Sequence, residues 1–182
     1  MKIVAPVSSV QEVEMLLHFG ADELYCGIST PEWEEHFGGH WWINRRSPRG
    51  ANLVSREGIQ EVVGLAHQRD VPVHVTLNAP FYTQGSIRYV LRLAEKLVSE
   101  LAIDSIIASD LNFLMLLSRE RLPVKIHLSS LGSCFNSRSV DFYSSLGIDR
   151  IILPRQLRLS EINQIVTGNN SQIEFEIFAV ND

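Results

Sequence analysis

The sequence is poor in the residues and motifs that usually mark a catalytic or metal centre. It contains only two cysteines, Cys26 and Cys134, which lie far apart and form no CxxC pattern, so they cannot make a four-thiolate metal site by themselves. Because cysteine is often buried, we expect two free thiols inside a protein of a reducing compartment. The sequence has no HExxH, no GxSxG and no glycine-rich phosphate loop after its first apolar run. Motifs therefore assign no nucleophile, zinc site or dinucleotide-binding fold.

The chain also lacks a basic excess and long apolar runs. Its 182 residues carry a net charge of −5, which argues against a general nucleic-acid binder and leaves room only for a local basic face. No apolar stretch approaches the roughly 20 residues that span a bilayer, and the opening run from Met1 to Pro6 is too short for a signal peptide. We expect a cytoplasmic protein with no membrane partner.

What the sequence does contain is an internal repeat. The segments Gly20–Cys26, Ala102–Ala108 and Gly147–Leu153 share one pattern: a helix end, a tight turn carrying Asp, and a run of apolar residues. Continuous apolar runs are typical of strands buried on both faces, as in parallel sheets. Their recurrence indicates a repeated unit of one strand and one helix.

The remaining units fit between these segments. Apolar spacing and cap residues predict six helices: from a cap at Ser8 or Ser9 to Gly20, after Ser55, from Ile87 to Leu101, Leu111–Arg119, Val140–Leu146, and after Ser160. Seven strands are predicted at Lys2–Ala5, Glu23–Cys26, Val73–Leu77, Ile106–Ile107, Lys125–Leu128, Ile151–Leu153 and Ile173–Val180. The fold class is therefore α/β, a TIM-like parallel (β/α) barrel that forms one domain over residues 1–182.

A barrel with seven strands is short of the usual number. Eight-stranded (β/α) barrels run to about 250 residues. We therefore expect either that the chain is the N-terminal part of a longer protein or that a partner completes the barrel. In the second case a homo- or hetero-oligomer would cover the open edge of the sheet.

Polar residues follow several of the predicted strands. The reactive face of such barrels lies at the carboxyl ends of the strands, where this sequence has Asn78, Asp110, Ser129 and Arg155. Asp110 and Arg155 are suited to bind a substrate cation and a substrate anion, respectively. The alternatives are that Asp110 caps the helix that follows, that Arg155 is a solvated turn residue, and that Asn78 shapes the loop before Pro80.

The segment from residue 36 to residue 56 is long for a connection between a strand and a helix, which suggests a functional loop. It has no acidic residue and carries His36, His40, Trp41, Trp42, Arg45, Arg46, Arg49 and Arg56. Arginine pairs with phosphate or carboxylate, and tryptophan offers a face for bases or other rings. The alternative is an Ω-loop packed by its own tryptophans, with solvated arginines. His74 and His127 fall inside predicted strands and are expected to be core histidines.

An ordered series of phrases resembles the collagenase-like peptidase family U32. The phrases are Gly20–Gly27, Val75–Asn78, Ser109–Asp110, His127–Ser129, Asn136 with Val140–Tyr143, and Arg150–Leu157 running into Ser160–Ile162. Arg45 or Arg46 followed by Asn52 also resembles the Arg- and Asn-bearing loop of the family. Single phrases are weak, but the series keeps its order and spacing over essentially the whole chain, which makes it fairly specific.

The resemblance implies a barrel-type catalytic domain. It also implies a cysteine cluster just after the strand that corresponds to Phe175–Val180, which binds a 4Fe-4S cluster in well-studied members. Those members act in oxygen-independent hydroxylation of RNA bases or of a quinone precursor, some of them with prephenate as the hydroxyl donor. This chain stops at Asp182 before any such cysteines, so we expect no cofactor in it and a cluster in a longer chain. Leu131 stands where many members have glutamine, so a role for that glutamine is not supported here.

Three functions follow as hypotheses. The first is an iron-sulfur-dependent, hydroxylase-type enzyme acting on RNA or a small cofactor precursor, with a small anionic substrate or RNA as partner. Its substrate-binding residues are expected to be Arg45, Arg46, Asn52, Asn78, Asp110, Ser129 and Arg155. The second is a peptidase, which needs a nucleophile with a base or a metal site, and the sequence patterns show neither. The third is a non-catalytic scaffold or partner subunit.

Overall fold

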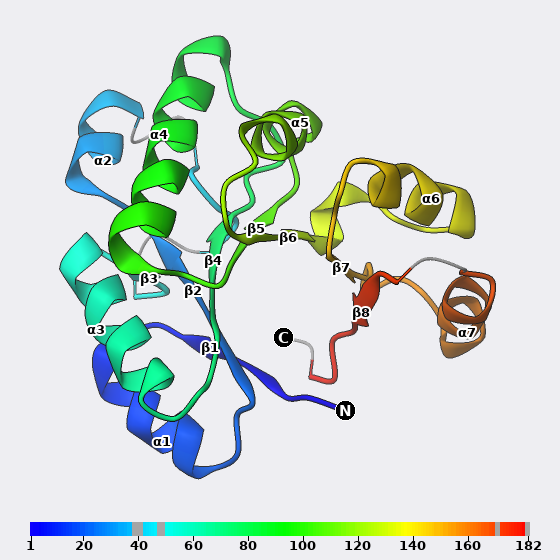
Figure 1. The fold of residues 1–182 in the computed structure, drawn as a ribbon, viewed down its shortest axis with the longest axis horizontal. Coiled ribbons are helices and arrows are strands. Elements are labelled where there is room, and N and C mark those ends of the chain that lie inside the picture. The colour runs from blue at the N-terminus through cyan, green and yellow to red at the C-terminus, as the bar shows by residue number, and fades with distance from the viewer. Residues whose placement is uncertain (38–41, 47–49, 170–171, 181–182) are drawn as a thin grey trace.

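The protein folds as a strongly curved parallel sheet with helices packed on its outer side (Figure 1). The computed structural model describes residues 1–37, 42–46, 50–169 and 172–180. Seven strands pair in the order β1-β2-β4-β5-β6-β7-β8, and the short β3 pairs with β2 beside that path. Their bounds are β1 Val4–Val7, β2 Glu23–Ile28, β3 Asn52–Leu53, β4 Val73–Leu77, β5 Ser105–Ala108, β6 Lys125–Leu128, β7 Arg150–Ile152 and β8 Glu174–Glu176.

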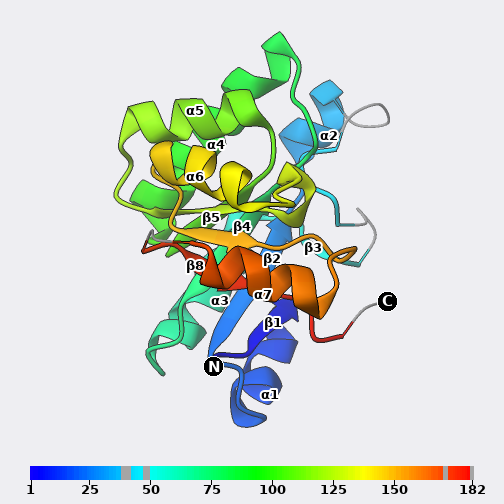
Figure 2. The ribbon, with the colours of Figure 1, turned by 90° about the vertical axis from the view of Figure 1, so that its right-hand side faces the viewer.

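The helices alternate with the strands, as in a (β/α) barrel. They are α1 Val13–His18, α2 Pro31–Phe37, α3 Arg56–His67, α4 Gln84–Leu101, α5 Leu111–Glu120, α6 Ser137–Ser145 and α7 Leu159–Thr167. Figure 2 shows the same sheet from the side, with α5, α6 and α7 on its outer surface. The predicted TIM-like barrel architecture is confirmed, and in the described residues it takes the form of a half-barrel in which β1 and β8 each pair with a single strand. An oligomer covering that edge stays a prediction.

The repeated Asp turn has a specific structural role. Asp22, Asp104 and Asp149 each precede a strand, and each carboxylate accepts a hydrogen bond from a backbone N–H at the start of a neighbouring strand. The donors are the N–H groups of Ile3 at 2.7 Å, Val73 at 2.8 Å and Ile126 at 2.8 Å, respectively. Because an unpaired backbone N–H is costly to bury, the same residue type recurs before β2, β5 and β7. The Asp of each sequence repeat therefore has the same role, which is to accept a hydrogen bond from a backbone N–H of a neighbouring strand.

Local capping explains where most helices begin. The side chains of Ser55, Thr83, Asp110 and Asn136 each accept a hydrogen bond from a backbone N–H in the first turn of α3, α4, α5 and α6, respectively. The predicted cap at Ser160 is wrong by two residues, because α7 begins at Leu159 and Arg158 occupies its N-cap position.

The sequence-based prediction missed two elements between β2 and α3. Residues 31–37 form α2, whose start carries a readable signal: the Thr30 hydroxyl accepts from the N–H of Trp33 at 3.1 Å, and Pro31 occupies the first helical position. Residues 52–53 form β3 beside β2. The loop predicted over residues 36–56 is therefore shorter in the structure, because its first two residues belong to α2 and Asn52–Leu53 form β3. His36 is one of the helical residues. His40, Trp41 and Arg49 lie outside the described residues.

The predicted strand ends differ from the structure by one or two residues in β2, β5 and β7, and the first and last strands differ as well. The first strand runs from Val4 to Val7 and not from Lys2. The last strand is only Glu174–Glu176, where a strand over residues 173–180 was predicted, and residues 181–182 lie outside the described part. Between these ends, buried apolar side chains of the strands and helices form one contiguous core, and it includes both Cys26 and Cys134. The prediction of two buried free thiols is confirmed.

Candidate functional site

A pocket of about 380 Å³ lies at the carboxyl ends of the strands, where (β/α) barrels carry their active sites. It is lined by Tyr25, Arg45, Arg46, Thr76, Asn78, Ile107, Ser129, Ser130, Leu131, Ile152, Arg155, Gln156, Glu176 and Phe178. Five of the seven residues predicted to bind substrate are in this set. The structure therefore brings together residues that are up to 110 positions apart in the sequence.

Arg46 is held in the pocket by contacts with β2 and with Ser8, the residue that follows β1. Its guanidinium lies 5.0 Å from the centre of the Tyr25 ring, a distance at which a cation and an aromatic ring attract each other. It donates hydrogen bonds to the hydroxyl of Ser8 at 3.0 Å and to the backbone carbonyl of Tyr25 at 3.4 Å. None of these acceptors is charged, so the positive charge of Arg46 is positioned without being neutralised by them.

The loop that carries the two arginines is tied down by Asn44 and by a glycine. The Asn44 amide donates to the carbonyl of Ile28 at 3.0 Å and accepts from the N–H of Arg46 at 2.9 Å. A Cβ atom on Gly27 would overlap the Asn52 side chain and approach both Arg46 and Asn44 to 3.0 Å. Glycine at this strand end thus makes room for the loop to pack directly on the β2 backbone.

Asn78 connects three segments of the pocket. Its carbonyl oxygen accepts from the N–H of Arg45 at 3.0 Å, and its NH₂ group donates to the Ser129 hydroxyl at 3.0 Å. The backbone carbonyl of Asn78 accepts from the Ser109 hydroxyl at 2.8 Å. Asn78 therefore shapes the loops, as the sequence-based alternative proposed, and does so at the wall of the pocket.

Arg45 and Arg155 lie at the exposed rim. The guanidinium of Arg45 stacks over Trp42 at 4.6 Å from the ring centre, and that of Arg155 over Phe178 at 4.3 Å. Among the described residues, no carboxylate forms an ion pair with Arg45, Arg46 or Arg155. Three guanidinium groups thus surround one pocket with their charges available to a ligand, an arrangement suited to carboxylate or phosphate.

Two of the predicted site residues do not line the pocket. Asp110 is buried and spends both carboxylate oxygens on backbone groups, accepting from the N–H of Phe113 at 2.7 Å and from that of Tyr82 at 3.1 Å. The capping alternative thus describes its position. Asn52 is buried in β3, where it pairs with Gly27 of β2. Substrate binding by the other five residues stays a prediction.

Some lining residues were missed by reading only the ends of strands. Tyr25 and Thr76 lie within strands, and Glu176 ends β8. A readable signal was present, because successive residues of a strand point to opposite faces, so that Tyr25 must face away from its buried neighbours Leu24 and Cys26. In a curved sheet that face is the inside of the barrel.

Deeper in the barrel, toward the amino ends of the strands, the interior is a connected polar network. Glu23 accepts from His74 at 2.8 Å, the other ring nitrogen of His74 lies 2.7 Å from the Ser105 hydroxyl, and that hydroxyl lies 3.3 Å from His127. Arg150 of β7 reaches across to Glu23 of β2 and donates to it through both terminal nitrogens. The strands β2 and β7 are separated by three other strands in the sheet. Their side chains can meet only because the sheet curves strongly.

The buried charges of this network are stabilised by ion pairs and hydrogen bonds with one another. Hydrogen bonds from His74, Arg150 and Lys2 outweigh burial and hold the pKa of Glu23 far below its usual range. Burial, with the positive charges nearby, lowers the pKa of His127 well below 6.5 and keeps its ring neutral. The expectation that His74 and His127 are core histidines is confirmed, because both are buried.

The order Glu23, His74, Ser105 resembles the hydrogen-bonding order of a hydrolase triad. The Ser105 side chain is fully buried, however, and Glu23 is already paired with Arg150. A nucleophile must reach the substrate carbonyl, and this hydroxyl faces the closed interior. The trio therefore offers no support for peptidase chemistry.

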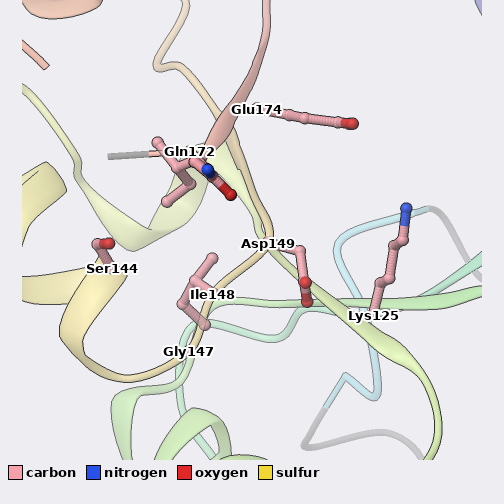
Figure 3. Close-up of a pocket in the computed structure, with 8 residues that line it drawn as sticks. Lys125, Ser144, Gly147, Ile148, Asp149, Gln172 and Glu174 are labelled. Carbon is pink, nitrogen blue, oxygen red and sulfur yellow. The ribbon is translucent and has the colours of Figure 1, made fainter. Parts of the chain in front are cut away.

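A second pocket, of about 370 Å³, lies at the opposite end of the barrel, where β6, β7 and β8 begin (Figure 3). In Figure 3, Lys125, Asp149 and Glu174 extend from the starts of these strands on one side of the pocket. Asp149 already accepts from the Ile126 N–H and Glu174 from Arg150. Because the amino ends of barrel strands usually serve stability, we assign this pocket no role in catalysis.

The iron-sulfur cluster implied by the resemblance does not fit the cysteines of this chain. Such clusters take about four cysteine thiolates, and the chain has two. Both are buried, and burial raises the pKa of Cys26 to about 12 and that of Cys134 to about 11, which disfavours the thiolate form. Within the described residues, no group of three or more His, Cys, Asp or Glu is placed to hold a metal ion.

None of the helices in the described part of the chain is both long enough and apolar enough to span a membrane.

Comparison with known proteins places this geometry in a family. The model of peptidase family U32 matches residues 8–182. The tRNA hydroxylation protein P of Helicobacter pylori is 26% identical over 181 residues, and the match covers 97% of this chain and 38% of that protein. The collagenase of Porphyromonas gingivalis is 27% identical over 166 residues, and the match covers 90% of this chain and 35% of that protein.

A solved structure supports the fold. The U32 peptidase Mk0906 superimposes with a TM-score of 0.70 at 14% identity, over 97% of this chain and 68% of that one. The chain spans less than two fifths of the length of these two curated relatives. With a family model that matches nearly its whole length, the chain belongs to peptidase family U32.

Proposed function

We propose that this chain is the substrate-binding barrel of an RNA-hydroxylating enzyme, and that its pocket binds a small anion used in the reaction. The observation that carries the proposal is the group of three arginines, Arg45, Arg46 and Arg155, around a pocket at the catalytic end of the barrel. The match to a relative named for tRNA hydroxylation covers 97% of this chain and 38% of that relative. Prephenate, an anion that the family resemblance implies as a hydroxyl donor, suits such a pocket.

The residues of this chain would bind and orient the anion. Guanidinium groups provide planar, paired N–H donors that match the two oxygens of a carboxylate. The stacking on Trp42, Tyr25 and Phe178 restricts each guanidinium before the ligand arrives, which reduces the entropy lost on binding. The Asn78 side chain links the backbone of Arg45 to the Ser129 hydroxyl and so fixes the two sides of the pocket relative to each other.

The iron-sulfur cluster is a separate part of the proposal. Since the two cysteines of these 182 residues do not fit it, we propose that it is ligated elsewhere in a longer protein, which would act in the cytoplasm where its RNA substrate is found. Iron and sulfide in stoichiometric amounts in the purified 182-residue chain would contradict this placement.

Peptidase activity is the second candidate, and one observation favours it: a relative at 27% identity is named collagenase. The pocket itself gives this candidate little support. Ser129 and Ser130 line it, yet the Ser129 hydroxyl contacts the Asn78 amide and the Leu131 N–H, neither of which is a base.

The test is a gene deletion followed by mass spectrometry of nucleosides from total tRNA and rRNA. We expect the deletion strain to lose a nucleoside that carries one extra oxygen, and the wild-type gene in its natural full length to restore it. Genes carrying Arg46→Ala or Arg155→Ala should restore less than a tenth of it, because each removes a guanidinium from the pocket.

Arg69→Ala provides the matched control. Arg69 is exposed and lies at the turn before β4, at the other end of the barrel, so its removal should leave the modification intact. An unchanged nucleoside profile in the deletion strain would contradict RNA hydroxylation. Loss of peptide cleavage in the same strain would favour the collagenase reading instead.

A further inference from the structure

One carboxyl group lies among the three arginines of the pocket. Glu174 and Glu176 are two positions apart on β8, so both side chains point to the inside of the barrel, whereas Phe175 between them packs against the core. Only Glu176 lines the anion pocket, and its side chain keeps 20% of its exposure. Among the described residues, it is the one acidic residue in that lining.

Glu176 receives the smallest share of a single positive charge. Arg150 donates two hydrogen bonds to Glu23 and two to Glu174, the latter at 2.9 and 2.7 Å. Its one bond to Glu176 is longer, 3.2 Å. One guanidinium thus faces three carboxyl groups, and two of them already compensate its charge.

The titratable and charged groups around Glu176 come from four strands and from the loops of the pocket. They are Glu23 of β2, His74 of β4, Arg150 of β7 and Glu174 of β8, with Arg45, Arg46 and Arg155 along the pocket. Burial, with help from the negative charge of Glu23, outweighs Arg150 and His74 and raises the pKa of Glu176. Of the three carboxyl groups that share Arg150, Glu176 is therefore the one whose pKa is raised, whereas the pKa values of Glu23 and Glu174 are lowered.

We propose that Glu176 determines the specificity of this pocket by binding the anion as a neutral carboxylic acid, donating its O–H to an oxyanion held by the arginines. The proposal deepens the proposed function, because it concerns the anion pocket of that function. A carboxylate at this position would repel the ligand and would have no proton to donate. Binding of the anion is therefore coupled to binding of one proton.

The coupling has a defined sign. An anion that prefers the protonated protein raises the pKa of Glu176, and its affinity falls as the pH rises above the pKa of the free protein. The limit for one coupled proton is about tenfold per pH unit. After proton loss the carboxylate can pair with Arg150, which lies 3.2 Å away.

The experiment is calorimetric titration of the purified protein with sulfate between pH 5 and pH 8. Sulfate keeps the same charge over this range, so any pH dependence belongs to the protein. We expect the affinity to fall at least fivefold over this range, with proton uptake seen as a difference in heat between buffers of different ionisation enthalpy. Glu176→Gln, which keeps a neutral hydrogen-bond donor, should bind sulfate at pH 8 as tightly as the wild type does at pH 5.

Glu174→Gln is the matched comparison, because Glu174 shares Arg150 but does not line the pocket. It should keep the fall in sulfate affinity with rising pH but move it to lower pH, because more of the Arg150 charge is then left for Glu176. Thermal unfolding of each variant confirms that it is folded. Sulfate binding that requires Arg46 but does not change with pH, or that Glu176→Gln leaves pH-dependent, overturns the inference and leaves the proposed function standing. No sulfate binding at any pH overturns the inference together with the anion pocket.

Discussion

The two ends of this barrel differ in whether their charged side chains are paired. At the amino end, the buried charges Glu23 and Arg150 are paired with each other and with His74, Lys2 and Glu174. At the carboxyl end, Arg45, Arg46 and Arg155 have no ion-pair partner among the described residues and surround a pocket. Because an unpaired buried charge is costly, we expect the first end to serve stability, and the second is the end that we propose to bind an anion.

Arg150→Ala should break the amino end with the largest effect. The change leaves Glu23 buried with no guanidinium, and removing one partner of a buried ion pair typically costs about 3–5 kcal/mol. The free energy of unfolding in urea should fall by this amount. The double variant Arg150→Met with Glu23→Leu should recover much of the loss, because it removes both charges at once. A single variant as stable as the wild type would contradict the assignment of this network to stability.

Gly27→Ala should affect the carboxyl end through the backbone. The added methyl group would overlap the side chain of Asn52 and crowd Arg46 and Asn44, and overpacking of this kind costs about 1–3 kcal/mol. We expect lower stability together with weaker binding of sulfate, since the arginine loop must move away from β2. Gly64→Ala, where the new Cβ meets no atom within 4 Å, is the control and should leave both quantities unchanged or slightly improved.

Acid should weaken the amino end through His127 and Glu23. Both pKa values are lowered in the folded protein, so the unfolded chain binds more protons and stability is lost as the pH falls. The loss should begin near 6.5 for His127 and continue below 4.5 for Glu23, with a slope of about 1.4 kcal/mol per pH unit for each proton taken up. Urea unfolding at pH 7, 6 and 5 measures it. In His127→Gln the loss between pH 6.5 and 5 should shrink, and an unaltered slope would count against this assignment.

Arg155→Ala should show the smallest effect on stability. Its guanidinium is at the exposed rim and stacks only on Phe178, and surface substitutions of this kind usually change stability by no more than about 0.5 kcal/mol. We expect an almost unchanged urea midpoint but clearly weaker sulfate binding. This pair of results, set beside Arg150→Ala, separates an arginine used for binding from one used for folding. A large loss of stability would place Arg155 in the structural class instead.

Much of the fold was predictable because its signals are local. The Asp turns, the apolar runs and the i, i+3, i+4 stripe of α4 identified the strand–helix units, and β4 was predicted at its observed bounds. The element at residues 31–37 was missed although Thr30 and Pro31 mark its start. The two-residue strand β3 carries no such signal, since it is defined by pairing with β2 and not by its own sequence.

The candidate site was predictable only in part. Reading the strand ends found Asn78, Ser129 and Arg155, because the topology of a barrel brings those positions to one end. It also selected Asp110, whose carboxylate turns back onto backbone N–H groups. Sequence position cannot distinguish the two outcomes, because a carboxylate at a strand end can cap the next helix or face the pocket, depending on which N–H groups come within reach.

The sequence by itself determined that this chain builds parallel strand–helix units, because a turn with Asp and an apolar run satisfy hydrogen bonds and burial within each unit. It also determined that two cysteines are too few for a four-thiolate cluster. Only the tertiary structure decided which charges are paired. Arg150 and Glu23 are 127 residues apart and meet because the sheet curves, whereas Arg46 and Arg155 form no ion pair in the described structure and remain available to the anion that we propose.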